Sequence, residues 1–289
     1  MSTLFDNIYL PSADGLRLHA LVYGDAHRGT TPVVCLPGLT RNAQDFHDLA
    51  VLLSDAEHRR RVIVIDYRGR GGSAYDPDWH HYTVTVEAVD VRQMLKALGV
   101  LEAFIVGTSR GGLITMVLAV THPILIKACV LNDIGPVIEA KGLERIASYV
   151  GKGSLPKDWD EAVLKLKASN ADFTDLAEIE WRAFATLVFQ ETAEGLQLRY
   201  DAALGNTLLG LDFSKPLPTA WPLFDALATV PVLVLRGENS DLLSEETLDE
   251  MAKRHGGMES LTVPNEGHAP FLGREATAGV IADFLGRVG

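Results

Sequence analysis

The chain has 289 residues, of which 47% are hydrophobic and 22% charged, a composition that can bury a large core without disulfides or metal ions. Its formal net charge of −12 argues against nucleic acids and anionic membrane surfaces as partners. No basic segment followed by an apolar stretch opens the chain, and no apolar run approaches the ~20 residues that span a bilayer, so we expect a cytoplasmic protein.

Strands and helices are predicted to alternate through the first half of the chain. Two extended runs in residues 8–25 flank Asp14-Gly15, a pair typical of a hairpin turn. Strands that are apolar throughout, separated by helices, indicate a mainly parallel sheet covered on both faces. The pattern predicts such strands at 32–38, 61–66, 103–107 and 126–133, and helices at about 46–53, 84–98 and 112–120.

The alternation stops after Asp133 and resumes near residue 223. Residues 134–222 show helical patterns, scattered Pro, Gly and aromatic residues, and no convincing strand. We therefore expect one α/β core domain formed by residues 1–133 and 223–289, interrupted by a helical cap at 134–222. The resumed pattern predicts strands at 231–237 and 259–264, a helix at 244–255 and a helix that closes the chain.

A serine lies between glycines where a predicted strand meets a predicted helix. The stretch Gly107-Thr108-Ser109-Arg110-Gly111 has the pattern G-x-S-x-G. At a sharp strand-to-helix turn the serine side chain is exposed, and flanking glycines avoid collisions with neighbouring backbone. The helix that begins there also offers free N–H groups to whatever binds the serine. The context favours a nucleophile.

A serine hydroxyl needs a base, and an acid to orient that base, to react at neutral pH. His268 and Asp241 each come just past the end of a predicted strand. The carboxyl ends of parallel strands meet at one edge of a sheet, so we predict that Ser109, Asp241 and His268 assemble there. Asp133, at the end of an earlier strand, and Glu238, in the same loop as Asp241, are the alternatives for the acid. With Asp241 as the acid, Asp133 is expected to hold the start of the insertion.

Two backbone N–H groups are predicted to bind the oxyanion that forms during acyl transfer. One is that of Arg110, directly after the serine. The other is that of Leu39, in a loop where Gly38 permits close approach. The Arg110 side chain either points into the pocket, where it would attract a carboxylate, or pairs with a nearby acid as part of the structure, and we favour the second interpretation.

Five motifs follow one another along the chain: LPGLT at 36–40, DYRGRGGS at 66–73, GTSRGG at 107–112, RGENSD at 236–241 and EGHAP at 266–270. Together they resemble the motifs of the α/β-hydrolase superfamily, and the resemblance covers essentially the whole chain. The resemblance implies a mainly parallel eight-stranded sheet with helices on both faces and a helical cap inserted after strand six, which residues 134–222 fit. It implies that Asp66 and Arg68 brace turns. Serine at position 109 separates the chain from dehalogenases and epoxide hydrolases of this fold, which use aspartate.

The combined interpretation is a cofactor-free serine hydrolase that cleaves a small carboxylic ester or lactone through an acyl-enzyme. One alternative is a carbon–carbon bond hydrolase of a diketone-type aromatic degradation product, and another is a ligand receptor on a hydrolase scaffold. We expect no metal site, because no Cys/His pair has metal-ligand spacing, and we expect Cys35 and Cys129 to be core residues. The expected partner is a small-molecule substrate, and the sequence does not indicate an oligomeric state.

Overall fold

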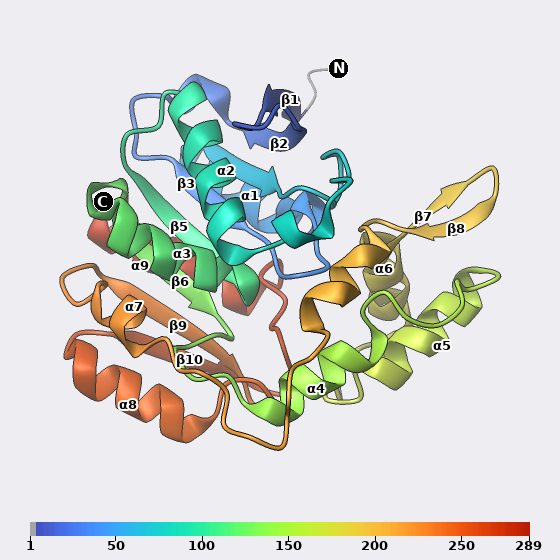
Figure 1. The fold of residues 1–289 in the computed structure, drawn as a ribbon. Helices are drawn as coiled ribbons and strands as arrows, with labels where there is room; N and C mark the ends of the chain where they lie inside the picture. Colours follow the sequence, from blue (N-terminus) through green and yellow to red (C-terminus); the bar gives the residue numbers. More distant parts are fainter. Residues whose placement is uncertain (1–3) are drawn as a thin grey trace.

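The computed structural model describes residues 4–289. Residues 1–3, part of the N-terminal stretch that we considered as a signal sequence, lie outside the described residues. Its centre is an eight-stranded sheet in the order β1-β2-β4-β3-β5-β6-β9-β10 (Figure 1). β2 is antiparallel to β1 and β4, and the other pairings in this sheet are parallel, which confirms the predicted architecture. The strands are β1 (Phe5–Pro11), β2 (Arg17–Tyr23), β3 (Val33–Leu36), β4 (Val62–Asp66), β5 (Ala103–Thr108), β6 (Ile126–Asn132), β9 (Val232–Gly237) and β10 (Glu259–Val263).

Helices cover both faces of the sheet, as the apolar strands predicted. α2 (Val84–Ala97), α3 (Arg110–Thr121) and α8 (Glu245–His255) pack in one hydrophobic cluster, and α1 (His47–Ser54) and α9 (Glu275–Val288) pack in a second. Alternate residues of a strand divide between them: Val34 lies in the first cluster, and Val33 and Cys35 in the second. Both cysteines are buried, as expected. None of the described helices is both long and apolar enough to cross a lipid bilayer.

Most of the chain between β6 and β9 forms a smaller group of elements to one side of the sheet, whereas α7 lies apart from this group and packs against α3 (Figure 1). α5, α6 and a hairpin share a separate hydrophobic cluster that includes Trp181, Phe184 and Phe189. The elements are α4 (Ala140–Tyr149), α5 (Trp159–Ser169), α6 (Glu178–Val188), β7 (Phe189–Thr192), β8 (Gly195–Leu198) and α7 (Trp221–Asp225).

Two details of this segment differ from the sequence prediction. The expectation that it contains no strand is wrong, because β7 and β8 form an antiparallel pair. Each strand has only four residues, too few for an alternating pattern to stand out. The predicted cap boundary at residue 222 falls inside α7, whose Phe224 packs in the main core with α3.

The turn between β5 and α3 has the strained geometry that the glycine pattern predicted. Ser109 has φ 51° and ψ −111°, outside the regions that side-chain-bearing residues usually adopt. A Cβ on Gly107 would lie 2.6 Å from the carbonyl carbon of Gly111, and one on Gly111 would lie 2.0 Å from the carbonyl oxygen of Leu36. The two glycines therefore allow strand, turn and neighbouring strand to pack closely enough to hold the serine in this conformation.

Replacing Gly111 with alanine tests this packing constraint. Gly111→Ala is expected to lower the free energy of unfolding by roughly 3 kcal/mol, because the new methyl group overlaps backbone that cannot move away. Gly279→Ala is the matched control: Gly279 also lies in a helix, α9, but a Cβ there meets nothing within 4 Å. Helix propensity favours alanine at both sites by about 1 kcal/mol. Chemical denaturation should show a lower free energy of unfolding for Gly111→Ala and no decrease for Gly279→Ala. Equal effects of the two substitutions would contradict the packing argument.

Candidate active site

Ser109 and His268 meet at the carboxyl edge of the sheet, as their positions after strand ends predicted. The Ser109 Oγ lies 2.9 Å from the His268 Nε2. Asn132 at the end of β6 braces this meeting, since its side-chain amide donates to the carbonyl of Pro270 at 3.0 Å and to Thr108 Oγ1 at 3.1 Å. The ends of β5 and β6 and the histidine loop are thereby joined, and the imidazole is within reach of the serine proton.

The acid that contacts His268 is Asp133 and not Asp241, which corrects the sequence prediction. The Asp133 Oδ2 lies 2.8 Å from the His268 Nδ1, and the Asp133 side chain is fully buried. Asp133 also accepts hydrogen bonds from the Gly237 backbone N–H at 2.8 Å and the Ser240 hydroxyl at 2.6 Å. These donors fix the carboxylate, so it can hold the imidazole in one orientation.

Asp241 instead binds the segment between β6 and β9. Arg145 of α4 donates to both of its carboxylate oxygens, at 2.6 and 2.8 Å. Burial alone would raise the pKa of Asp241, but the Arg145 hydrogen bonds and charge hold it below the ordinary value. The roles expected of the two aspartates are therefore exchanged: Asp133 contacts the histidine, and Asp241 anchors the inserted segment. The other alternative, Glu238, accepts from the backbone N–H of Asn265 and braces the loop before His268.

Asp172 is a contact of His268 that the sequence did not indicate. Its Oδ2 accepts from the His268 backbone N–H at 3.0 Å, and its backbone carbonyl accepts from the Asn239 amide at 2.9 Å. Asp172 lies after α5, far from any strand end, so no pattern pointed to it. The contact ties the inserted segment to the histidine loop.

The two residues predicted to supply oxyanion donors lie beside Ser109. Gly38 is so close that a Cβ placed on it would sit 3.8 Å from the Ser109 Cβ, and Leu39 lines the same cavity as Ser109. Arg110 opens α3, so its N–H precedes the helical hydrogen bonds. Within residues 4–289, neither the Leu39 nor the Arg110 N–H has a hydrogen-bond acceptor. Both groups are available to a ligand, and their role as oxyanion donors remains a prediction.

The Arg110 side chain pairs with a buried acid, as we favoured from the sequence. Its Nε donates to Glu87 of α2, and its Nη2 donates to the Tyr82 carbonyl at 2.8 Å. Asp66 and Arg68 likewise brace turns. Asp66 accepts from two backbone N–H groups and contacts a histidine, and Arg68 binds three aspartates.

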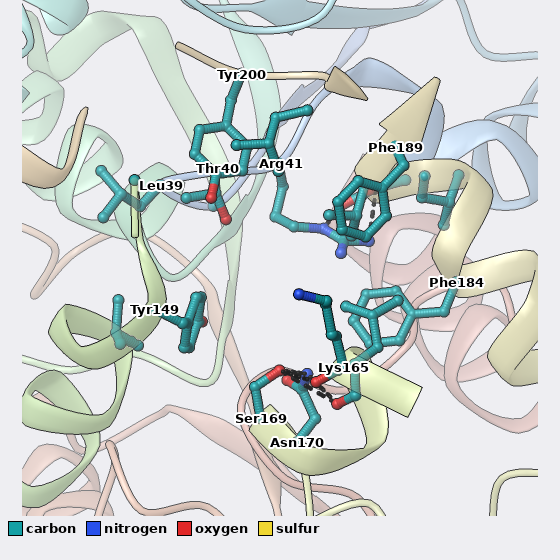
Figure 2. Close-up of a pocket in the computed structure, with 18 of the residues that line it drawn as sticks. Leu39, Thr40, Arg41, Tyr149, Lys165, Ser169, Asn170, Phe184, Phe189 and Tyr200 are labelled. Carbon is teal, nitrogen blue, oxygen red and sulfur yellow. Dashed lines mark hydrogen bonds and ion pairs between the residues drawn. The ribbon is translucent and has the colours of Figure 1, made fainter. Parts of the chain in front are cut away.

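Ser109 and His268 line a cavity of about 1060 Å³. Loops of the sheet domain form its floor, and the segment between β6 and β9 forms the rest of its wall. Figure 2 shows Phe184 and Phe189 on one side, Leu39 and Tyr149 on the other, and Lys165 extending between them. A space of this size accommodates a ligand larger than a simple acetate ester.

Other reactive groups lie away from this cavity. Among the described residues, two groups of side chains are close enough to share a metal ion, namely Asp14, Asp76 and His81, and Asp55, Glu57 and His58. None of these six lines the cavity, and the first group already binds Arg68 through two carboxylates. Burial raises the pKa of Cys129 to about 12, so this thiol is not a nucleophile near neutral pH.

The sheet, the strained serine turn and the hydrogen-bonded Ser109–His268–Asp133 chain define a hydrolase of the α/β type. The family model described as the alpha/beta hydrolase fold matches residues 31–275. The chain therefore belongs to the α/β-hydrolase family.

Relatives with a described activity share most of the chain. A 3-hydroxybutyrate-oligomer hydrolase from Cupriavidus necator is 32% identical over 282 residues, which cover 93% of each chain. A 2-(acetamidomethylene)succinate hydrolase from Mesorhizobium japonicum is 28% identical and covers 89% of each chain. The crystal structure of an alpha/beta hydrolase from Novosphingobium aromaticivorans matches with a TM-score of 0.90 at 40% identity, over 99% of this chain and 100% of that one.

The exchange of aspartate roles leads to opposite expectations for two matched variants. Asp133→Asn should lower kcat by about 10³- to 10⁴-fold, because the amide no longer orients or stabilises the imidazole. Asp241→Asn should leave kcat within about threefold, since Asp241 touches Arg145 and not His268, and should lower the free energy of unfolding by about 1–3 kcal/mol. Steady-state kinetics and thermal unfolding of both variants check this. Loss of turnover in the Asp241 variant alone would restore the original assignment.

Proposed function

We propose that the protein is a serine hydrolase that cleaves carboxylic esters through an acyl-enzyme. The observation that supports it is the hydrogen-bonded chain from Ser109 through His268 to buried Asp133, at the floor of a large cavity. Nothing in this arrangement requires a cofactor, because serine supplies the nucleophile and histidine moves the proton.

The proposed reaction has two halves. His268 Nε2 takes the proton of Ser109 as Oγ attacks the ester carbonyl, and Asp133 stabilises the resulting imidazolium. The N–H groups of Leu39 and Arg110 hold the oxyanion, which collapses as His268 returns the proton to the departing alcohol. Water then attacks the acyl-serine as His268 takes one of its protons. The bond between the acyl carbon and Ser109 Oγ breaks, His268 returns the proton to Oγ, and the acid leaves with one oxygen from that water. A lactone follows the same steps, except that the released hydroxyl stays attached to the acyl group and a single hydroxy acid is formed.

Two observations favour an ester over a carbon–carbon bond or a ligand without turnover. The relative from Cupriavidus necator is named for hydrolysis of 3-hydroxybutyrate oligomers, and hydroxy acids join to one another through ester bonds. The spacing of Ser109 Oγ and His268 Nε2 is already that of a proton-transfer pair, which a receptor does not need.

The cavity wall further favours a substrate with a negative charge. Three of its side chains are cationic, from Arg41, Lys152 and Lys165, and two are anionic, from Asp45 and Asp201, whereas the chain as a whole carries −12. Arg41 binds Asp45 with two hydrogen bonds. Lys165 donates to the carbonyl and hydroxyl of Ser154 and forms an ion pair with Glu161 at 3.5 Å, but Glu161 does not line the cavity. Lys165 therefore offers a charge that is only partly compensated within the cavity. We include in the proposal that Lys165 binds a carboxylate at the far end of the acyl group.

Replacing the nucleophile tests the general proposal. Ser109→Ala should lower kcat on 4-nitrophenyl esters by at least about 10⁴-fold, while binding of the same esters changes little. A panel of acyl lengths, with lactones and a purified diketone included, should show turnover of esters, lactones or both with a length cut-off. Turnover of the diketone alone would favour the carbon–carbon alternative. No turnover of any compound, and no labelling of Ser109 by a fluorophosphonate, would favour the receptor.

Replacing Lys165 tests the negative charge of the substrate. Wild-type protein should prefer 4-nitrophenyl hydrogen glutarate to the uncharged ester of the same shape, 4-nitrophenyl 5-methylhexanoate. Lys165→Met should lower kcat/KM for the charged ester by about tenfold or more and leave the uncharged ester nearly unchanged. Lys167→Met is the control, because Lys167 lies on the same helix, pairs with Glu178 and does not line the cavity. Equal effects of the two variants would remove Lys165 from the proposal.

A further inference from the structure

One buried carboxylate, that of Glu87 in α2, binds two guanidinium groups. Its Oε1 accepts from the Arg70 Nη1 at 2.7 Å, and its Oε2 accepts from the Arg110 Nε. The side chains of Glu87 and Arg70 are fully buried, and that of Arg110 is 12% exposed. Burial alone would raise the pKa of Glu87, but the two arginines lower it below the ordinary value, so the carboxylate stays charged.

The two arginines lead to the two segments that carry the predicted oxyanion donors. The Arg110 N–H is itself one of these donors, and the Arg110 side chain is fixed between Glu87 and the Tyr82 carbonyl. Arg70 donates through Nε to the Leu39 carbonyl oxygen at 2.8 Å, one peptide unit beyond the Leu39 N–H. The two segments follow different strands, β3 and β5, so they are far apart along the chain and are held together by non-covalent contacts.

The loop that carries Leu39 is held on both sides of the Gly38–Leu39 peptide. Arg70 binds the carbonyl that follows this peptide, and the buried hydroxyl of Tyr67 donates to the Pro37 carbonyl that precedes it, at 3.2 Å. Arg70 also lies over the rings of Tyr67 and Tyr82, at 5.6 and 5.4 Å from their centres. The orientation of the peptide therefore depends on where Arg70 is held. Two groups accept from the Arg70 Nη1, the Glu87 carboxylate at 2.7 Å and the Arg68 carbonyl at 2.6 Å, and of these Glu87 alone also binds Arg110.

We propose that Glu87 is a positioning residue for the oxyanion hole, because it holds Arg70 and Arg110 so that the Leu39 and Arg110 N–H groups converge on one point beside Ser109. Donors of this kind stabilise charge only when their directions are fixed before the reaction, and a displacement of about 1 Å is enough to weaken them strongly. The proposal rests on the proposed esterase function. It predicts that Glu87 acts on the tetrahedral state and not on substrate binding.

The test compares Glu87→Gln with Asp90→Asn. Asp90 lies on the same helix and binds the buried Arg68 side chain through two hydrogen bonds, and this side chain contacts neither Leu39 nor Arg110. Arg68 reaches Arg70 only through its backbone carbonyl, which the substitution at position 90 leaves in place. Asp90→Asn therefore disturbs an equally buried ion pair without touching the oxyanion segments. Each variant is assayed with 4-nitrophenyl butyrate. Each is also titrated with 1,1,1-trifluoroheptan-2-one, to whose carbonyl carbon Ser109 Oγ adds while its proton passes to His268 and an oxyanion forms. Heptan-2-one serves as the ketone that does not form this adduct readily.

Glu87→Gln should lower kcat by roughly tenfold to a hundredfold with KM within about twofold, and should weaken the trifluoromethyl ketone by the same factor as kcat. The affinity of Glu87→Gln for heptan-2-one should not change. Asp90→Asn should have the wild-type kcat and the wild-type affinity for both ketones, whatever its melting temperature. Wild-type kcat and ketone affinity in Glu87→Gln would overturn the proposal, as would an equal loss in Asp90→Asn.

If Glu87→Gln does not fold, Arg70→Lys replaces it in the same assays. Lysine keeps the positive charge beside Glu87 but lacks the Nε–H that binds the Leu39 carbonyl, so the same parallel loss of kcat and trifluoromethyl ketone affinity is expected. Unchanged values in that variant would overturn the proposal. If the wild-type protein neither hydrolyses the ester nor binds the trifluoromethyl ketone, the proposed function itself fails, which is a different result from a wild-type enzyme that is insensitive to Glu87.

Discussion

Parallel pairing of β3, β5, β6, β9 and β10 directs the chain that follows each strand to one edge of the sheet. Leu39, Ser109, Asp133 and His268 all lie in such segments, so residues far apart in the sequence meet there. The Asp133 N–H donates to the Leu235 carbonyl and so continues the pairing of β6 and β9 beyond the end of the strand. Because the site is built on paired strand ends, its geometry is set by the sheet before any ligand arrives.

The role of each buried carboxylate follows from its partners. Asp133, Asp241 and Glu87 are all acids, yet one contacts an imidazole, one a single guanidinium and one two guanidiniums. A buried charge without a partner is costly, so each carboxylate is committed to the donors that the fold brings to it. Residue type therefore limits what an acid can do here, and the neighbouring elements decide which of those things it does.

The segment that covers the cavity is also attached to the loop after β9 and to the histidine loop. Arg145 of α4 binds Asp241, and Asp172 accepts from the His268 backbone N–H. The same segment supplies Lys165 and most of the cavity wall. Elements that contact a substrate and elements that hold the imidazole thus belong to one connected unit. Of these two contacts, that of Asp172 reaches the backbone of His268 directly.

The sequence by itself determined the sheet, the strained turn at Ser109 and the histidine that meets it, because apolar strand runs and glycine-flanked turns are local signals. It led us to Asp241 as the acid, with Asp133 as an alternative, and the structure shows Asp133 in contact with the histidine. Both follow the ends of strands that pair side by side, β6 and β9, so their local patterns are alike. The choice depends on Arg145, 96 residues before Asp241, and on Ser240 and Gly237, more than 100 residues after Asp133. The hydrogen bond between Asp172 and His268 joins residues 96 apart, and those of Glu87 join residues 17 and 23 apart that lie in different elements. Only the tertiary structure decides such pairings, because they arise from which side chains packing brings within about 3 Å of one another, a distance that no local pattern encodes.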